Sequence, residues 1–143
     1  MAEEKNKWID AITKLTKLTQ EGKLKWSSAS STDVLVSDDV QQVEAVFTAT
    51  HKDKRLRLYK KRFKVEEPSN PWFGATSILS HRKYPYWTAQ IYLELVDTHG
   101  HSLWTFPEVS ALSDLLTSVK YQVSGVKDFL NDLLEEQIAE QAG

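Results

Sequence analysis

The chain contains no cysteine among its 143 residues. This absence excludes a disulfide framework, a thiolate nucleophile and a zinc site with sulfur ligands, and it favours a reducing compartment. No stretch approaches the roughly 18 apolar residues of a transmembrane helix, and the opening sequence MAEEKNK lacks the apolar run of a signal peptide. We therefore expect a cytoplasmic protein.

Motifs of common enzyme classes are missing as well. The sequence has no G-x-S-x-G, no H-E-x-x-H and no glycine-rich phosphate loop. No Ser or Thr is marked as a nucleophile by a neighbouring base. We predict no catalytic residue and no cofactor, and expect binding rather than catalysis.

The material for one folded domain is present. Apolar residues make up 41% of the chain and charged residues 27%, and five Trp, five Tyr and five Phe supply bulky core side chains. The length matches one domain. We expect residues 1–143 to form a single domain.

Apolar periodicity predicts the order of the elements. Residues 4–21 show one apolar helical face and are followed by Gly22, which favours a helix end. A second helix should begin after Ser110, a good N-cap, and run for about 25 residues, with Gly125 as a point where it could break. Strands are expected at 23–26, 43–50, 55–65, 86–96 and 101–106, and a brief extended piece at 34–36.

These elements predict the α+β class. The simplest packing is an antiparallel sheet of about five strands, with the N-terminal helix and the long C-terminal helix on one face. Residues 51–54 should form a hairpin turn, and the large residues of the following strand change parity near Lys60, which predicts a bulge or a strong twist there.

Charge is unevenly distributed, although the net charge is only −2. Residues 52–64 hold eight Lys and Arg against one Asp, a local charge of +7 (8 − 1). From residue 108 onward there are seven acids against two Lys, a local charge of −5 (2 − 7). Such polarity steers association with charged partners.

The basic hairpin and the loop after it supply the candidate binding residues. Cations beside aromatic rings suit single-stranded nucleic acid, and they also suit an acidic protein surface. Two plainer interpretations are a solvated strand face and internal or intersubunit pairing with the acidic C-terminal helix. The candidate residues are Lys54, Arg55, Arg57, Tyr59, Lys61, Arg62, Phe63, Trp72, Phe73, Arg82 and Lys83.

Within this set, Trp72 and Phe73 lie between loop-forming residues in Pro71-Trp72-Phe73-Gly74. If they are exposed, they form a docking patch for a partner. If they fold back, they close one end of the core.

The C-terminal helix carries an apolar stripe with 4-3 spacing. This spacing is typical of a coiled-coil seam, and therefore of a homodimer or a partner's docking surface. It is equally typical of a helix that lies across its own sheet, and both interpretations hold if the helix overhangs the sheet. The stripe comprises Leu112, Leu116, Val119, Val123, Val126, Leu130 and Leu133.

Three potential metal ligands occur in Asp97-x-His99-x-His101. The same residues also make an ordinary polar hairpin turn, and we predict no metal site. A metal-assisted enzyme centred on His99 and His101 is the third functional hypothesis.

The nine residues Leu18 to Trp26 (LTQEGKLKW), with Phe106-Pro107-Glu108 and Asp128-Phe129-Leu130, carry a resemblance. They resemble small, largely uncharacterised bacterial α+β proteins with the layout helix, EGK-hydrophobic-K-W, sheet, FP, long helix. The resemblance implies the fold and a prokaryotic origin, and it implies no function.

The leading functional hypothesis is a non-enzymatic protein-interaction module, such as an adaptor, a regulator or an immunity-type protein. It would bind an acidic partner surface through the basic hairpin and the aromatic loop, and it could act as a homodimer. The alternative is a nucleic-acid-binding regulator that uses the same hairpin. We expect neither a membrane nor a small-molecule substrate as partner.

Overall fold

A computed structural model describes residues 2–30, 41–66 and 85–142. Its strands form one antiparallel sheet in the order β1-β2-β3-β4-β5, and the helices precede and follow the sheet in the chain. The predicted α+β class is thereby confirmed, while the predicted extended piece at 34–36 lies outside the described residues. The elements are α1 (Ala2–Gln20), β1 (Ser27–Ser28), β2 (Gln41–His51), β3 (Lys54–Val65), β4 (Tyr86–Val96), β5 (Ser102–Thr105), α3 (Ala111–Ser124) and α4 (Val126–Ala142).

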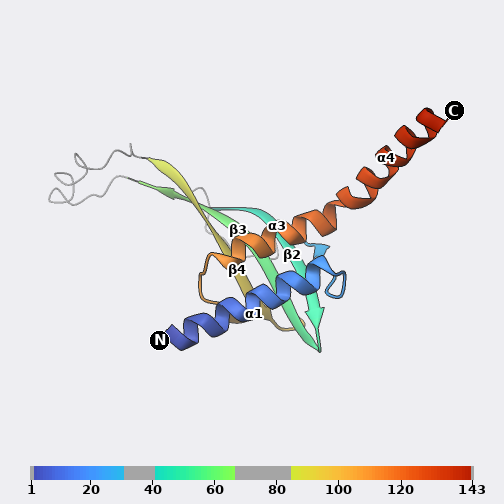
Figure 1. Ribbon diagram of the computed structural model, residues 1–143. Helices are drawn as coiled ribbons and strands as arrows, with labels where there is room; N and C mark the ends of the chain where they lie inside the picture. The colour runs from blue at the N-terminus through green and yellow to red at the C-terminus, as the bar shows by residue number, and fades with distance from the viewer. Residues whose placement is uncertain (1, 31–40, 67–84, 143) are drawn as a thin grey trace.

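Helices α1 and α3 lie side by side across one face of the sheet (Figure 1). Their apolar faces meet the sheet, where Ile12 of α1 and Leu115 of α3 are fully buried against Leu58 of β3. Each such side chain stabilises the fold by roughly 1.5–3 kcal/mol relative to full exposure. The main core therefore lies between two helices and the sheet, and a smaller buried cluster of Val46 and Tyr59 lies on the opposite face.

Strand β4 follows the alternation expected from its sequence, with Ile91, Leu93 and Leu95 toward the helices and Tyr92 on the other face. In β2 the expected alternation holds for Ala45, Phe47 and Ala49 but is wrong for Val43, which lies on the opposite face. Strand β4 has the predicted bounds, and β3 pairs with it in unbroken register from Arg55 to Val65. The predicted bulge near Lys60 is instead on the facing strand, because Val43 pairs with Lys61 and Ala45 with Lys60, which leaves Glu44 as the extra residue.

The β2–β3 turn is as predicted. Its two central residues, Lys52 and Asp53, have positive φ values of 47° and 68°. Positive φ at both positions gives the tight connection whose twist matches that of the flanking strands. The cations next to this turn are therefore held at one end of the sheet.

The predicted strand at 23–26 is wrong. The side chain of Gln122, from α3, forms hydrogen bonds with backbone groups of this segment. Its Oε1 accepts from the Trp26 N–H at 2.7 Å, and its Nε2 donates to the Leu24 carbonyl at 2.9 Å. The same Nε2 donates to the Thr19 carbonyl at 3.0 Å. A side chain distant in sequence thus takes the bonds that a strand would have used.

The predicted long C-terminal helix is broken at Gly125, which has φ 71°. This left-handed conformation ends α3, and α4 then projects away from the sheet (Figure 1). Ser110 occupies the N-cap position of α3, but its side chain makes no capping hydrogen bond, because its φ of −59° and ψ of −27° are already helical. Within the described residues, no helix is both long and apolar enough to cross a bilayer.

We expect Gln122→Ala to lower the free energy of unfolding by about 2–3 kcal/mol, because backbone groups of α1 and of 24–26 lose their partners. Urea denaturation followed by Trp fluorescence measures this change. The matched control is Gln20→Ala, which removes one exposed hydrogen bond, to Ser118, and should cost less than about 0.5 kcal/mol. Equal effects of the two substitutions would contradict this role of Gln122.

Candidate functional site

The residues of β3 divide between the two faces of the sheet. Leu56 and Leu58 point toward α1 and α3, while Arg57 and Tyr59 lie on the opposite face. Arg57 and Tyr59 are each only 6% exposed. Two predicted binding residues are therefore buried.

Arg57 is bonded within the protein. Its Nε and Nη2 lie 3.3 and 3.1 Å from Oε1 of Glu94, the residue directly opposite on β4. Its Nη1 donates to the carbonyl of Gly100 at 2.7 Å. This guanidinium therefore joins β3, β4 and the β4–β5 turn, and it is not available to a partner.

Tyr59 stacks on Tyr92, with 5.2 Å between the ring centroids and an angle of 19° between the planes. Burial, reinforced by the nearby negative charge of Glu94, raises the pKa of Tyr59. Burial also raises the pKa of Tyr92, with a further contribution from Glu108. The two rings support the sheet from the face opposite the helices.

The cations further along β3 are partly matched. Glu44, the bulge residue, lies 3.3 Å from Arg62 Nε and 3.7 Å from Lys60 Nζ. Arg62 also lies 5.2 Å above the ring of Trp87. These pairs are well solvated, so each contributes at most about 1 kcal/mol.

Lys61 and Phe63 lie together on the face opposite the helices. Lys61 Nζ is 5.5 Å from the ring centroid of Phe63 and 5.5 Å from that of Tyr92. Both side chains are half-buried. This contact is a cation–π cluster within the sheet rather than a projecting recognition surface.

Lys54 and Arg55 remain at the β2–β3 turn beside Lys52, and all three are exposed. Among the described parts of the chain, no carboxylate lies within ion-pair distance of these three cations. We call them the basic turn. Trp72, Phe73, Arg82 and Lys83 lie outside the described residues.

The sequence interpretation missed an apolar surface at β5. Leu103 and Trp104 are 66% and 53% exposed. Trp104 stacks on Trp8 of α1 at 6.2 Å, and Trp8 meets Phe106 edge-on at 5.2 Å. We call Trp8, Leu103, Trp104 and Phe106 the aromatic patch.

A bulge explains why two neighbouring large residues are exposed together. Trp104 pairs with Leu95 and Ser102 with Val96, so Leu103 is the extra residue. A bulge changes the direction of side chains at a sheet edge. Two consecutive bulky residues in so short a strand cannot both follow its alternation, and this was the available signal in the sequence.

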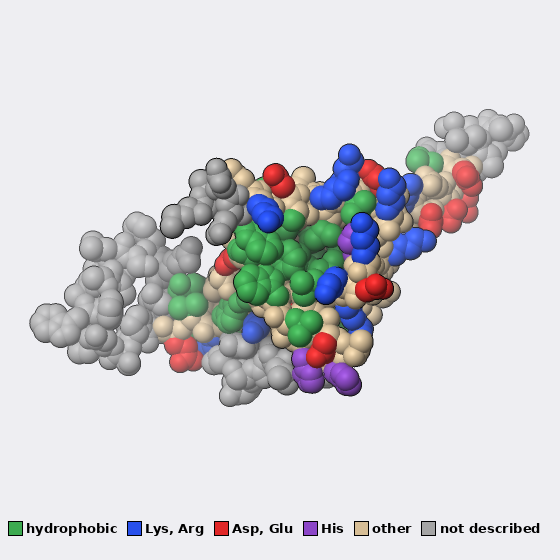
Figure 2. All heavy atoms as spheres, turned by 90° about the horizontal axis from the view of Figure 1, so that it is seen from below, with side chains coloured by type: hydrophobic (Ala, Val, Ile, Leu, Met, Phe, Trp, Pro, Cys, Tyr) green, Lys and Arg blue, Asp and Glu red, His purple; other side chains and the backbone are tan. Residues whose placement is uncertain are grey.

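Figure 2 views the end of the molecule that carries the hairpin turns. Hydrophobic side chains gather in one broad area there, and Lys and Arg side chains gather along one side of that area. The described His side chains belong to the end of β2 and to the β4–β5 connection, and in this view some lie among the Lys and Arg side chains and others at the lower edge. An apolar surface thus adjoins a basic one.

The predicted apolar stripe is shared between two environments. Leu112, Leu116 and Val119 lie in the core under α3, whereas the large apolar side chains of α4 are exposed. The interpretation as a helix that lies across its own sheet is confirmed for the α3 half, and the interpretation as a coiled-coil seam or docking surface stays a prediction for the α4 half. The exposed fractions are 59% for Phe129, 44% for Leu130, 46% for Leu133 and 56% for Leu134.

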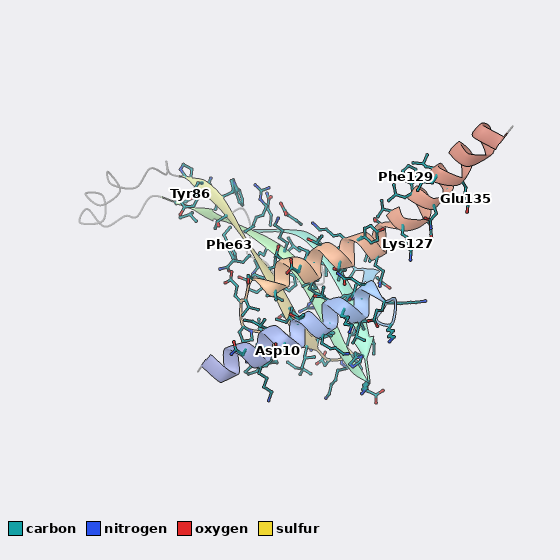
Figure 3. The ribbon with its side chains drawn as sticks, in the orientation of Figure 1. Asp10, Phe63, Tyr86, Lys127, Phe129 and Glu135 are labelled. Carbon is teal, nitrogen blue, oxygen red and sulfur yellow. The ribbon has the colours of Figure 1, made fainter. Side chains whose placement is uncertain are left out.

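The view with side chains shows how α4 presents them. Phe129 and Glu135 project from different sides of α4, and both lie clear of the sheet (Figure 3). The helix is therefore amphipathic, and the described elements of the chain leave it exposed.

Asp97 organises the β4–β5 turn. Its Oδ1 accepts from the backbone N–H groups of His99 and His101, both at 2.9 Å, and its Oδ2 lies 3.3 Å from His101 Nδ1. These bonds, that of His101 first, hold the pKa of Asp97 below its ordinary value. The residues that the structure describes contain no cluster of three or more potential metal ligands.

Comparison of the chain with protein-family models, with curated proteins and with solved structures finds no match in any of the three. The function must therefore be inferred from the residues of this chain.

We expect Arg57→Ala to destabilise the fold by about 3–5 kcal/mol, because it leaves Glu94 as an unpaired buried charge. The matched control is Arg55→Ala on the same strand, which should change stability by less than about 0.5 kcal/mol. Urea denaturation compares them. An Arg57→Ala protein as stable as wild type would contradict the structural role of Arg57, which would then again be a candidate binding residue.

Tyr59 should make the fold sensitive to alkali. Because its pKa is raised above 10.0 in the folded state, its contribution is complete below pH 10 and is lost as the pH rises further, when only the unfolded chain releases the proton. We expect the wild-type unfolding free energy to fall faster than that of Tyr59→Phe above pH 10, by up to about 1.4 kcal/mol per pH unit. Urea titrations at stepped pH measure this difference, and parallel curves would contradict it.

Proposed function

We propose that the protein is a non-enzymatic interaction module that binds an acidic, amphipathic segment of a partner protein. The segment would lie on the aromatic patch with its acids toward the basic turn. The observation that carries the proposal is the exposure of Leu103 and Trp104 near the end of the sheet at which Arg55 pairs with Val96, and Val96 with Ser102. At that end the cations of the basic turn have no ion pair among the described residues, and a hydrophobic area adjoins Lys and Arg side chains (Figure 2). An adaptor, a regulator or an immunity-type protein would use such a surface.

The apolar part would supply most of the affinity. Burying exposed apolar area contributes about 25 cal/mol per Å², and Trp is among the residues enriched at the centres of interfaces. Trp104 is already oriented by its stacking on Trp8, so little rotamer freedom remains to be lost on binding. The aromatic patch thus takes the role that the sequence assigned to Trp72 and Phe73.

The basic turn would supply selectivity and rate. Lys52, Lys54 and Arg55 project into solvent at the end of the hairpin. Exposed cations attract acidic partners and repel basic ones, and their effect on association falls as salt is added.

Nucleic acid is the weaker candidate. Single-stranded nucleic acid stacks on exposed rings next to cations, but of the residues that the sequence nominated for this role Tyr59 and Arg57 are buried and Arg62 faces Glu44. Trp104 is an exposed ring that remains for such a strand. Among the described candidate residues, Lys54 and Arg55 are exposed, and Lys61, Arg62 and Phe63 are half-buried.

Fluorescence anisotropy with three labelled probes tests the proposal: an amphipathic helical peptide of Leu and Glu, the same peptide with Lys for Glu, and a single-stranded oligonucleotide. We expect the Glu peptide to bind tightest and to weaken with salt. Trp104→Ser should weaken it about tenfold or more, the equivalent of about 1.4 kcal/mol.

The matched control is Trp87→Ser, which alters another exposed Trp outside the aromatic patch and should leave binding unchanged. An equal loss of affinity for the Glu peptide in both variants would contradict the assignment of the aromatic patch as the binding site. Tighter oligonucleotide binding, with a log–log salt slope of about −0.7 per phosphate contacted, would favour the nucleic-acid alternative.

A further inference from the structure

We infer that α4 of one copy is itself a ligand for the aromatic patch of a second copy, so that the protein associates head to tail with itself. This inference rests on the proposed function, because it uses the same patch, and it names the occupant.

Helix α4 has an apolar stripe that no described residue of the chain covers. In the described part of the chain, the only element that α4 contacts to any extent is α3, the helix that precedes it. Phe129, Leu130 and Leu133 are 44–59% exposed along its side. Its 17 residues span about 26 Å at 1.5 Å per residue, which is long enough to cross a patch made by several side chains.

Charge complementarity selects the patch as the docking surface for α4. Between residues 126 and 136, α4 carries Asp128, Asp132, Glu135 and Glu136 against Lys127, a local charge of −3 (1 − 4). Pairing of α4 with a second α4 would bring these like charges together, which is unfavourable. Docking beside Lys52, Lys54 and Arg55 brings opposite charges together instead.

The occupant is a second copy because α4 cannot reach the patch of its own chain. Gly125 turns the chain so that α4 leaves the body beyond the C-terminal end of α3 (Figure 1). Trp8 lies near the start of α1, whose N-terminus is at the opposite side of the molecule. Two separated and complementary surfaces on one chain give a contact of the head-to-tail kind.

A mixing experiment with full-length variants tests this contact. One variant, Leu130→Asp with Leu133→Asp, keeps the patch and loses the stripe. The other, Trp104→Ser, keeps the stripe and loses the patch. Light scattering after size exclusion measures the mass of each alone and of the equimolar mixture.

We expect wild type to assemble at high concentration and each variant to be monomeric. The mixture should form a one-to-one pair, because it contains one intact stripe and one intact patch that can meet only once. The pair should weaken as salt is added. Leu103→Asp replaces Trp104→Ser if the latter fails to fold by circular dichroism, and Asn131→Asp and Trp87→Ser are the controls that should assemble like wild type.

Three results would overturn the inference. Wild type could remain monomeric at the highest soluble concentration, the Trp104→Ser variant could still dimerise through its own α4, or the mixture could fail to pair. The Glu peptide of the preceding experiment, measured on the Leu130→Asp, Leu133→Asp protein, separates the two proposals. If it binds while self-association is absent, only the inference about α4 is wrong.

Discussion

The left-handed conformation of Gly125 is the constraint on which the architecture of the C-terminal half depends. A residue with a Cβ atom would be strained at φ 71°, whatever space surrounds it. The chain therefore ends α3 there and starts a new helix in another direction. The apolar periodicity continues across the break, so Val119 faces the core and Leu130 faces solvent. The positive φ of Gly125 therefore divides one apolar stripe between α3, which packs in the core, and α4, which is exposed.

Buried polar contacts decide which charges remain for a partner. Arg57 is held by Glu94 and by the carbonyl of Gly100, and Gln122 holds the backbone of 24–26. Each is satisfied because an unpaired buried group costs roughly 1–3 kcal/mol or more. The basic hairpin is thus not one surface. Arg57 in its middle is part of the folded structure, Arg62 pairs with Glu44, and the cations of the basic turn are exposed.

Local pattern predicted the long elements but not the tertiary substitutions. The alternation in β4 and the periodicity of α1 are visible in the sequence, since burial of one face dictates them. The hydrogen bond from the Trp26 N–H to Gln122 Oε1 depends on a partner distant in the chain. So does the bulge at Glu44, which is defined by pairing with β3. A short stretch of sequence contains neither partner. For the same reason the sequence predicts Arg57 as a binding residue and gives Trp104 no such role. The exposure of a side chain depends on how the helices pack on the sheet, which the local sequence does not contain.

If α4 of a neighbour occupies the aromatic patch, as we propose, there is a thermodynamic consequence for any other ligand. One patch that includes Trp104 could not hold α4 of a neighbour and a partner's acidic segment together. Binding of the proposed partner would therefore oppose self-association, and the two equilibria would be linked reciprocally. Because the cations of the basic turn would attract both ligands, salt would weaken both contacts. The outcome at a given ionic strength then depends on the apolar contacts, where the fit against Trp8 and Trp104 distinguishes one amphipathic helix from another.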